Sequence, residues 1–313
     1  MKNEYSVPKK ELIESGEYGE IEGCLEGTYF YDIDRSAGQT EIDFLEEIAK
    51  MGLKPIKPLR FGVKGWDTVN INEFGHMALC EDQEGRKYKV RNCFSLSEAN
   101  RMQTVVNFAT AKKVSTPGIV GRKGQVLVLD YIEGDNPSES LEELDLLAVA
   151  KAHFSMEIPF ETLEGRVREK LNDLINCSIN FVNEIDSDKA WYLKNKLDEL
   201  FPDKIIPVFD HQDNGVHNLL KGVDGKFWWI DEEAFGILPF GYTLERALYG
   251  NGGHGICVSE AQRETYVSVF TDEQIEYYNN TREFWKLLLV TRSVARALFN
   301  KDLVRAIKLL SEI

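Results

Sequence analysis

The chain has 313 residues, of which 43% are hydrophobic and 28% are charged, an ordinary composition for a globular protein with a substantial core. Its formal net charge of −15 at pH 7 argues against nucleic acid or an anionic membrane as a partner. The five cysteines are scattered without C-x-x-C spacing, and no apolar run is long enough to cross a bilayer. These features predict a cytoplasmic protein with reduced thiols.

The first stretch, residues 1–54, is predicted to be an extension that contains one helix. Residues 40–51 show helical periodicity, with Thr40 able to cap the start and Gly52 placed to end it. The apolar face of this helix is predicted to comprise Ile42, Leu45, Ile48 and Ala49. The proline-containing segment 54–58 that follows is typical of a linker.

A series of short strands is predicted next, because apolar and polar residues alternate between glycine-containing turns. The predicted strands span residues 67–72, 77–81 and 87–91. Ser95 then opens a helix with Glu98 three residues later, which is the spacing of a capping box. A further apolar strand begins at Gly124 and runs into a second glycine, Gly134.

From Asp135 onward the pattern is mostly helical. Helices are predicted to span residues 137–152, 163–182 and 189–200, and two more to lie within 281–313. Two short strands joined by an Asp-Gly turn are predicted around residues 219–230. The order of elements therefore predicts a β-rich part followed by a mainly helical part.

The polar residues that flank this hairpin form the most specific pattern in the chain. His211-Gln-Asp213 is followed by Asn218, five residues after the aspartate, and Asp231 ends the second strand. The hairpin is predicted to bring Asn218 and Asp231 together, and an amide oxygen beside a carboxylate suits Mg²⁺. Each residue also has an ordinary alternative, since Asp and Asn are common in turns and at strand ends.

This pattern resembles the aminoglycoside phosphotransferase and choline kinase superfamily, the small-molecule kinases with a protein-kinase-like fold. The resemblance implies that Asp213 orients the acceptor hydroxyl and accepts its proton, while His211 braces the loop from behind. It implies that Asn218 and Asp231 bind Mg²⁺ at the phosphates of ATP. Glu233 would add an outer contact to metal or substrate, and an ordinary surface charge is the alternative left open.

The same resemblance assigns the preceding strands to nucleotide binding. Gly75 would lie in the loop over the phosphates, where the lack of a Cβ permits close approach. Arg91 stands where kinases carry the strand lysine, Lys89 lies on the same strand face, and Glu98 would pair with the cation. The alternatives left open are solvated edge charges for the two cations and a simple capping role for Glu98.

Two further segments resemble the family. Residues 124–134 resemble the hinge between kinase lobes, which implies that the carbonyl of Asp130 and the N–H of Ile132 meet the adenine. His153 ends a helix that resembles the family's Leu-Ala-x-Leu-His segment, and a structural bond to the catalytic segment is expected of it. Metal binding by His153 is the alternative.

One feature separates the chain from protein kinases, and another departs from the small-molecule kinases. Protein kinases carry a lysine two residues after the catalytic aspartate, and here Gly215 stands there. Small-molecule kinases usually carry an aspartate after a Tyr or Phe in the segment that follows the metal-binding aspartate. Here Thr243 follows Tyr242, so the source of that structural hydrogen bond is in question.

We therefore predict an α+β, two-lobed protein-kinase-like fold. Residues 1–54 would be an extension, 55–133 a small nucleotide-binding amino lobe, and 134–313 a larger, mainly helical catalytic lobe. The predicted function is ATP- and Mg²⁺-dependent transfer of the γ-phosphoryl group to a hydroxyl of an amino alcohol, an aminoglycoside or a sugar. The acidic charge suits a cationic acceptor, although solubility explains that charge equally well. A nucleotide-binding pseudokinase or scaffold is the alternative, and the oligomeric state is left open.

Overall fold

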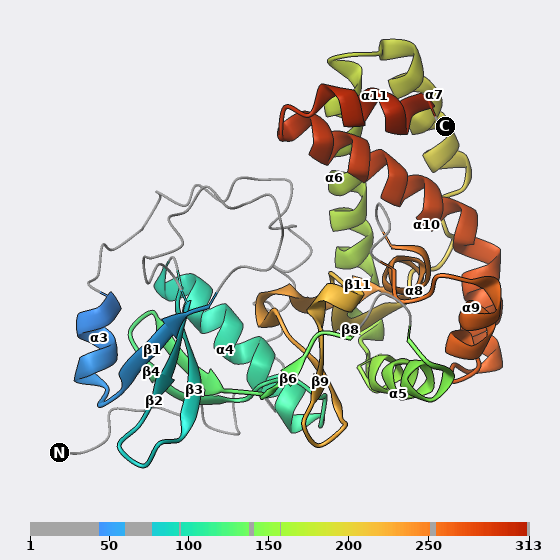
Figure 1. The fold of residues 1–313 in the computed structure, drawn as a ribbon. Helices are drawn as coiled ribbons and strands as arrows, with labels where there is room; N and C mark the ends of the chain where they lie inside the picture. The colour runs from blue at the N-terminus through green and yellow to red at the C-terminus, as the bar shows by residue number, and fades with distance from the viewer. Residues whose placement is uncertain are drawn as a thin grey trace. The chain divides into compact units, whose positions relative to one another are not determined.

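The structure is a computed structural model that describes residues 44–59, 77–93, 95–137, 141–156, 158–250 and 255–311. Gly75, the predicted cap Thr40 and the predicted strand 67–72 lie outside the described residues. The described chain divides into two compact units, with the segment 220–233 belonging to the first of them (Figure 1). None of the described helices is both long and apolar enough to cross a membrane.

The first unit is built on a five-stranded antiparallel sheet with the order β1-β2-β3-β5-β4. Its strands are β1 Lys54–Pro58, β2 Met77–Glu81, β3 Lys87–Asn92, β4 Ile119–Lys123 and β5 Val126–Asp130. The predicted strands 77–81 and 87–91 are confirmed. The prediction of a linker at 54–58 is wrong, because this segment is an edge strand, and an edge strand tolerates proline since only one side pairs.

Two helices cover the two faces of this sheet. Helix α3 Phe44–Lys50 shares a core with Val126 and Val128 of β5, whereas α4 Leu96–Ala111 shares a core with Leu127 and Leu129. Successive strand residues point to opposite faces, so this sorting places the helices on opposite sides.

The apolar face predicted for the first helix is partly wrong. Phe44 and Ile48 are buried, whereas Leu45 is 42% exposed and Ala49 is exposed. Residues 44 and 48 are four apart and share one helix face, and this face packs on the sheet. Gly52 follows the helix with a φ of 75°, consistent with its predicted role at the helix end.

A smaller sheet with the order β10-β9-β6 contains the predicted hairpin. Its strands are β6 Gly134–Asp135, β9 Leu219–Gly222 and β10 Phe227–Trp229. The turn is closed by the N–H of Gly222, which donates to the carbonyl of Lys226 at 2.9 Å, and Gly225 supplies a φ of 77°. The predicted hairpin is confirmed.

The second unit is mainly helical and surrounds a three-stranded antiparallel sheet with the order β11-β8-β7. The strands are β7 Ile158–Pro159, β8 Pro207–His211 and β11 Phe235–Pro239. The helices are α5 Glu143–Phe154, α6 Glu164–Asn183, α7 Ser187–Glu199, α8 Phe240–Tyr249, α9 Glu260–Val267, α10 Asp272–Phe299 and α11 Leu303–Ser311. A sheet-based unit and a mainly helical unit confirm the predicted α+β class.

The helix boundaries show where periodicity was a sufficient guide. Helices α6 and α7 match their predictions to within two residues at each end. The helix predicted from Pro137 begins only at Glu143, and the tail helix predicted from Thr281 begins at Asp272. Helix α8 was not predicted, and it is buried almost all round, its polar residues Thr243, Glu245 and Arg246 included.

Candidate active site

The two cations of β3 lie on the α4 face of the central sheet and take part in ion pairs. Strand β3 lies between β2 and β5, so the alternative of solvated edge charges is wrong. The Nζ of Lys89 donates to both carboxylate oxygens of Glu232, at 3.0 and 2.7 Å. The side chain of Lys89 is 15% exposed and that of Glu232 is fully buried, which makes this an interior ion pair.

Glu232 was missed by sequence reasoning, because a second acidic residue after a strand-ending aspartate is typical of a surface. Burial works to raise the pKa of this carboxyl, but the charge and hydrogen bonds of Lys89 bring the pKa below its usual value. Glu232 is therefore ionised at neutral pH. It anchors the chain one residue beyond Asp231.

Arg91 forms an ion pair with Glu233, the residue after Glu232. Its guanidinium is almost fully buried and contacts the carboxylates of Glu98, at 3.4 Å, and Glu233. The backbone N–H of Glu98 also donates to the Ser95 hydroxyl at 3.1 Å. Both predicted alternatives for Glu98 therefore hold, with its backbone in the helix cap and its carboxylate in the ion pair. The surface-charge alternative for Glu233 is wrong.

These two ion pairs hold the two residues that follow Asp231, which lies two residues after the end of β10. Its φ of 69° lies in the left-handed region, which asparagine and aspartate visit more readily than most residues. Lys89 and Arg91 bind the two residues that follow it. We infer that this double attachment holds the backbone turn and so sets the direction of the Asp231 carboxylate.

Replacing Lys89 by methionine is expected to lower the free energy of unfolding by about 3–5 kcal/mol, because Glu232 is left buried and ionised without its partner. Replacing Lys89 and Glu232 together by methionine should recover most of this loss. Urea unfolding measures both effects. The control is Lys54→Met, which removes an exposed pair with Glu81 and should cost under about 1 kcal/mol. Similar losses in the two single variants would contradict the interior ion pair.

Acid is expected to destabilise the fold as the pH drops below about 4. The pKa values of Asp210, Asp213 and Glu232 are all lowered in the folded protein. Their stabilisation is therefore complete above the unfolded pKa of about 4 and is lost as the pH falls toward the folded values. When the free energy of unfolding is measured by urea titration at several pH values, its slope against pH should be smaller in the double methionine variant than in wild type. The difference should be up to about 1.4 kcal/mol per pH unit. An unchanged slope would show that Glu232 takes up no proton on unfolding.

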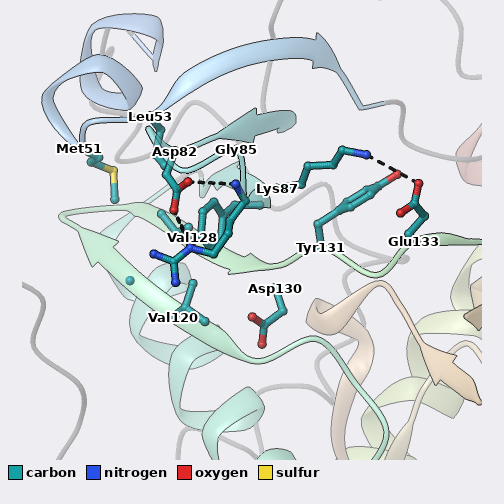
Figure 2. A pocket seen from close by; sticks show the side chains of 13 residues that line it. Met51, Leu53, Asp82, Gly85, Lys87, Val120, Val128, Asp130, Tyr131 and Glu133 are labelled. Atoms are coloured by element: carbon teal, nitrogen blue, oxygen red, sulfur yellow. Dashed lines mark hydrogen bonds and ion pairs between the residues drawn. The ribbon is translucent and has the colours of Figure 1, made fainter. Parts of the chain in front are cut away.

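The opposite, α3 face of the same sheet carries an open cavity of about 840 Å³ (Figure 2). Met51, Tyr88, Val128 and Asp130 are among its lining residues, and burial raises the pKa of Asp130. Tyr88 is adjacent in sequence to Lys89, so its side chain points to the other face of β3. This cavity therefore does not collect the cations predicted to bind phosphate. The adenine contacts of Asp130 and Ile132 remain predictions.

In the second unit, Asp213 lies in the turn after β8, and cationic and polar groups hold its carboxylate. Arg246 of α8 donates two N–H groups to one oxygen, the Nε at 3.1 Å, and His217 Nε2 lies 3.1 Å from the other. Burial works to raise the pKa of Asp213, but Arg246 and His217 hold it well below its usual value. Sequence reasoning missed Arg246 because it missed the helix that carries it.

The rest of the turn fixes the backbone of Asp213. Its N–H donates to Nδ1 of His211 at 3.2 Å, and the buried His211 ring meets Phe235 edge-on at 4.9 Å between ring centroids. The Nδ2 of Asn218 donates to the carbonyl of Asp213 at 2.9 Å. His211 thus has the bracing geometry that was predicted for it.

Asn218 and Asp231 each offer an oxygen of a kind that binds Mg²⁺. The amide nitrogen of Asn218 donates to the carbonyl of Asp213, and the amide oxygen of Asn218 therefore points away from that carbonyl. Amide and carboxylate oxygens are the ligands Mg²⁺ prefers, and it commonly takes only one or two from protein when it binds with a nucleotide. Asn218 immediately precedes β9 and Asp231 follows β10, so one hairpin joins the two along the chain.

The two units and the order of their elements give the chain a fold that solved structures of small-molecule kinases share. Solved structures confirm this fold. Choline kinase LicA from Streptococcus pneumoniae is similar with a TM-score of 0.55 at 13% identity, over 86% of this chain and 98% of that one. Plasmodium vivax ethanolamine kinase gives a TM-score of 0.55 at 14% identity, over 82% and 78%.

The streptomycin–ATP ternary complex of APH(2")-IIa gives a TM-score of 0.58 at 14% identity, over 88% of this chain and 97% of that one. Comparison of the sequence with protein-family models and with curated proteins gives no match. The predicted resemblance to the aminoglycoside phosphotransferase and choline kinase superfamily is therefore confirmed at the level of the fold.

Proposed function

We propose that this chain is a small-molecule kinase that transfers the γ-phosphoryl group of ATP to a hydroxyl group. One observation carries the proposal: the turn 211–218 holds a buried, ionised Asp213 between His211 and Asn218. A fixed carboxylate of this kind can orient a hydroxyl and accept its proton. The similar structures support the reaction class, since they include a choline kinase, an ethanolamine kinase and an ATP complex.

In this proposal the chain's own residues divide the work. Asn218 and Asp231 would hold Mg²⁺, whose charge offsets that of the phosphates. Lys89 and Arg91 would keep Asp231 in place through Glu232 and Glu233 and offer positive charge on the same strand face. Gly75, Asp130 and Ile132 keep the nucleotide contacts proposed for them on the resemblance alone.

The acceptor is proposed to be an amino alcohol, an aminoglycoside or a sugar. The net charge of the chain suits a cationic acceptor in general. Arg246, however, neutralises the carboxylate of Asp213, so a cationic group gains little attraction at that atom. The preference for a cation would have to come from other acidic side chains. A cytoplasmic location stays a prediction.

Thermal unfolding with and without nucleotide tests the proposal. ATP with Mg²⁺ should raise the melting temperature, because a ligand at a hundred times its Kd stabilises the folded state by about 2.7 kcal/mol. Phosphate transfer to a panel of amino alcohols, aminoglycosides and sugars should then identify the acceptor class. The kinase proposal fails if millimolar ATP and Mg²⁺ leave the melting temperature unchanged.

A nucleotide-binding protein without transfer activity is the second candidate. The ion pair between Arg246 and Asp213 favours it, because a carboxylate with a strongly lowered pKa is a weaker base. Nucleotide binding without transfer to any acceptor, and without hydrolysis of ATP, would decide for this candidate.

A further inference from the structure

Asp210 is a buried carboxylate that the proposed chemistry does not use. It lies in β8, one residue before His211, and is fully buried. An ionised group removed from water is costly unless several donors compensate it. Its surroundings supply such donors from the turn at the end of β8 and from α5.

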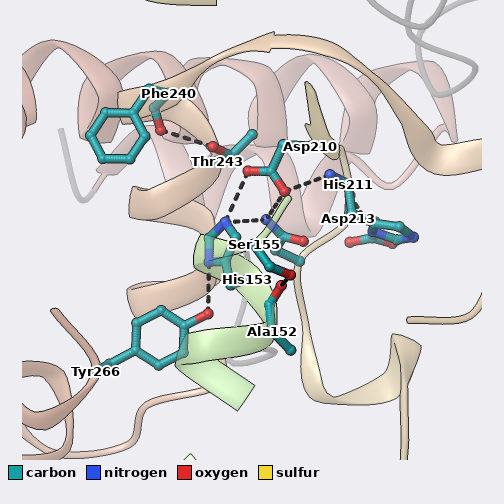
Figure 3. A network of polar contacts seen from close by, with 10 residues as sticks. Ala152, His153, Ser155, Asp210, His211, Asp213, Phe240, Thr243 and Tyr266 are labelled. Carbon is teal, nitrogen blue, oxygen red and sulfur yellow. Dashed lines mark hydrogen bonds and ion pairs between the residues drawn. The ribbon is translucent and has the colours of Figure 1, made fainter. Parts of the chain in front are cut away.

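Figure 3 shows these contacts gathered around the carboxylate. One oxygen accepts from the N–H of His211 at 2.6 Å and from Nδ2 of Asn214 at 3.1 Å, and the other lies 2.9 Å from Nε2 of His153. The Thr243 hydroxyl donates to the carbonyl of Phe240 at 2.8 Å and lies beside the carboxylate of Asp210.

The neighbours of Asp210 belong to the turn that carries Asp213, here called the catalytic turn, and to two helices. His211 and Asn214 belong to the turn that carries Asp213, His153 ends α5, and Thr243 lies in the first turn of α8. The second ring nitrogen of His153 lies 2.7 Å from the hydroxyl of Tyr266, so the network also extends to α9. The structural role predicted for His153 is therefore realised through Asp210.

We propose that Asp210 is the positioning residue of the catalytic turn and replaces, from strand β8, the aspartate that α8 lacks at Thr243. The side chain of Thr243 lies beside the carboxylate of Asp210, so a residue of α8 and a residue of β8 approach the same point. One carboxylate at this point satisfies the donors of the turn, and either position could supply it. Asp210 acts through His211 and Asn214 and has no part in the proton transfer itself.

If Asp210 has this role, a carboxylate at position 243 should be able to replace it. Asp210→Ser should lower the melting temperature by roughly 10 °C, because it leaves buried donors without their acceptor. Thr243→Asp alone should also lower it, because two carboxylates would then share one buried site. The double variant Asp210→Ser/Thr243→Asp should recover at least half of the larger loss.

Hydrogen exchange of the peptide 208–219 separates positioning from general stability. Asp210→Ser should increase exchange in this peptide at least tenfold, and the double variant should restore protection. The control is Leu193→Ala, which opens a cavity in the separate core of α7 and α10 and should destabilise by about 2–5 kcal/mol. It should leave exchange at 208–219 unchanged under native conditions. Equal exchange in Asp210→Ser and Leu193→Ala, or a double variant that restores nothing, would overturn the inference.

Measurement of ATP turnover gives a second test of the role of Asp210, and this test rests on the proposed function. With water or an identified hydroxyl as acceptor, Asp210→Ser should lower kcat at least tenfold with KM for ATP within threefold of wild type, and the relocated carboxylate should restore kcat. An unchanged kcat in Asp210→Ser would count against the positioning role. If wild type turns over no ATP, the proposed function fails, while the exchange experiment still decides the role of Asp210.

Discussion

Asp231→Asn is expected to abolish the part of nucleotide binding that depends on Mg²⁺. The amide keeps the size of the side chain and tolerates the left-handed φ of 69°, so the backbone turn should survive. It removes the negative charge that a hard divalent cation prefers. In thermal unfolding, ATP should stabilise wild type more with Mg²⁺ than with EDTA, and this difference should vanish in the variant.

The hairpin itself offers a matched control. Asp224 lies in the exposed turn between β9 and β10, where its carboxylate accepts from the N–H of Lys226 at 3.0 Å. Asp224→Asn makes the same chemical change in the same hairpin and should leave the Mg²⁺ dependence as in wild type. A Mg²⁺ effect that survives in Asp231→Asn would show that another residue supplies the ligand.

The residues around this hairpin show how much of the candidate site can be predicted from the local sequence. The spacing of Asp213, Asn218 and Asp231 around a hairpin is short-range information, because a turn and two strands fix it within twenty residues or so. The contact of His211 with the N–H of Asp213 is equally local, because the two residues are two positions apart in the chain. Each depends only on strand alternation and on turn chemistry.

The groups that set the electrostatics of the site were not predictable in this way. Arg246 reaches Asp213 from 33 residues away, and Lys89 reaches Glu232 from 143 residues away. Periodicity carries no information on which charges meet across such distances. A carboxylate such as Glu232 has the composition of a surface residue, and only the fold reveals that it is buried beside a cation.

The prediction of secondary structure failed for a related reason at two strands and one helix. Strand β1 was hidden by its two prolines, which an edge position tolerates, and β4 by Gly121, where the pairing register shifts. Helix α8 was missed as well, although it carries polar residues, because Thr243, Glu245 and Arg246 are buried together with its apolar residues. In each case the tertiary position, which the local sequence does not encode, decided what the segment could be.

Asp213→Asn is expected to reduce phosphate transfer by roughly 10²–10⁴-fold with little change in nucleotide affinity, because the amide cannot accept the hydroxyl proton. The measurement is kcat with the acceptor identified by the panel, together with the Kd of the Mg²⁺–nucleotide complex. The variant also leaves Arg246 buried beside a neutral partner, which should destabilise the fold. Asp213→Asn/Arg246→Met removes this penalty and should regain stability while transfer stays lost, so that unfolding cannot explain the result.

Arg246→Met alone tests whether the ion pair governs the basicity of Asp213. In wild type the cation holds the pKa of this carboxyl well below its usual value, so the acid limb of the rate profile should lie below about pH 4. Without the cation, burial remains and raises the pKa, so the acid limb should move to higher pH. A profile that does not move would exclude Asp213 as the proton acceptor, whereas a shift together with loss of activity in Asp213→Asn would establish that Arg246 sets the working range of the base.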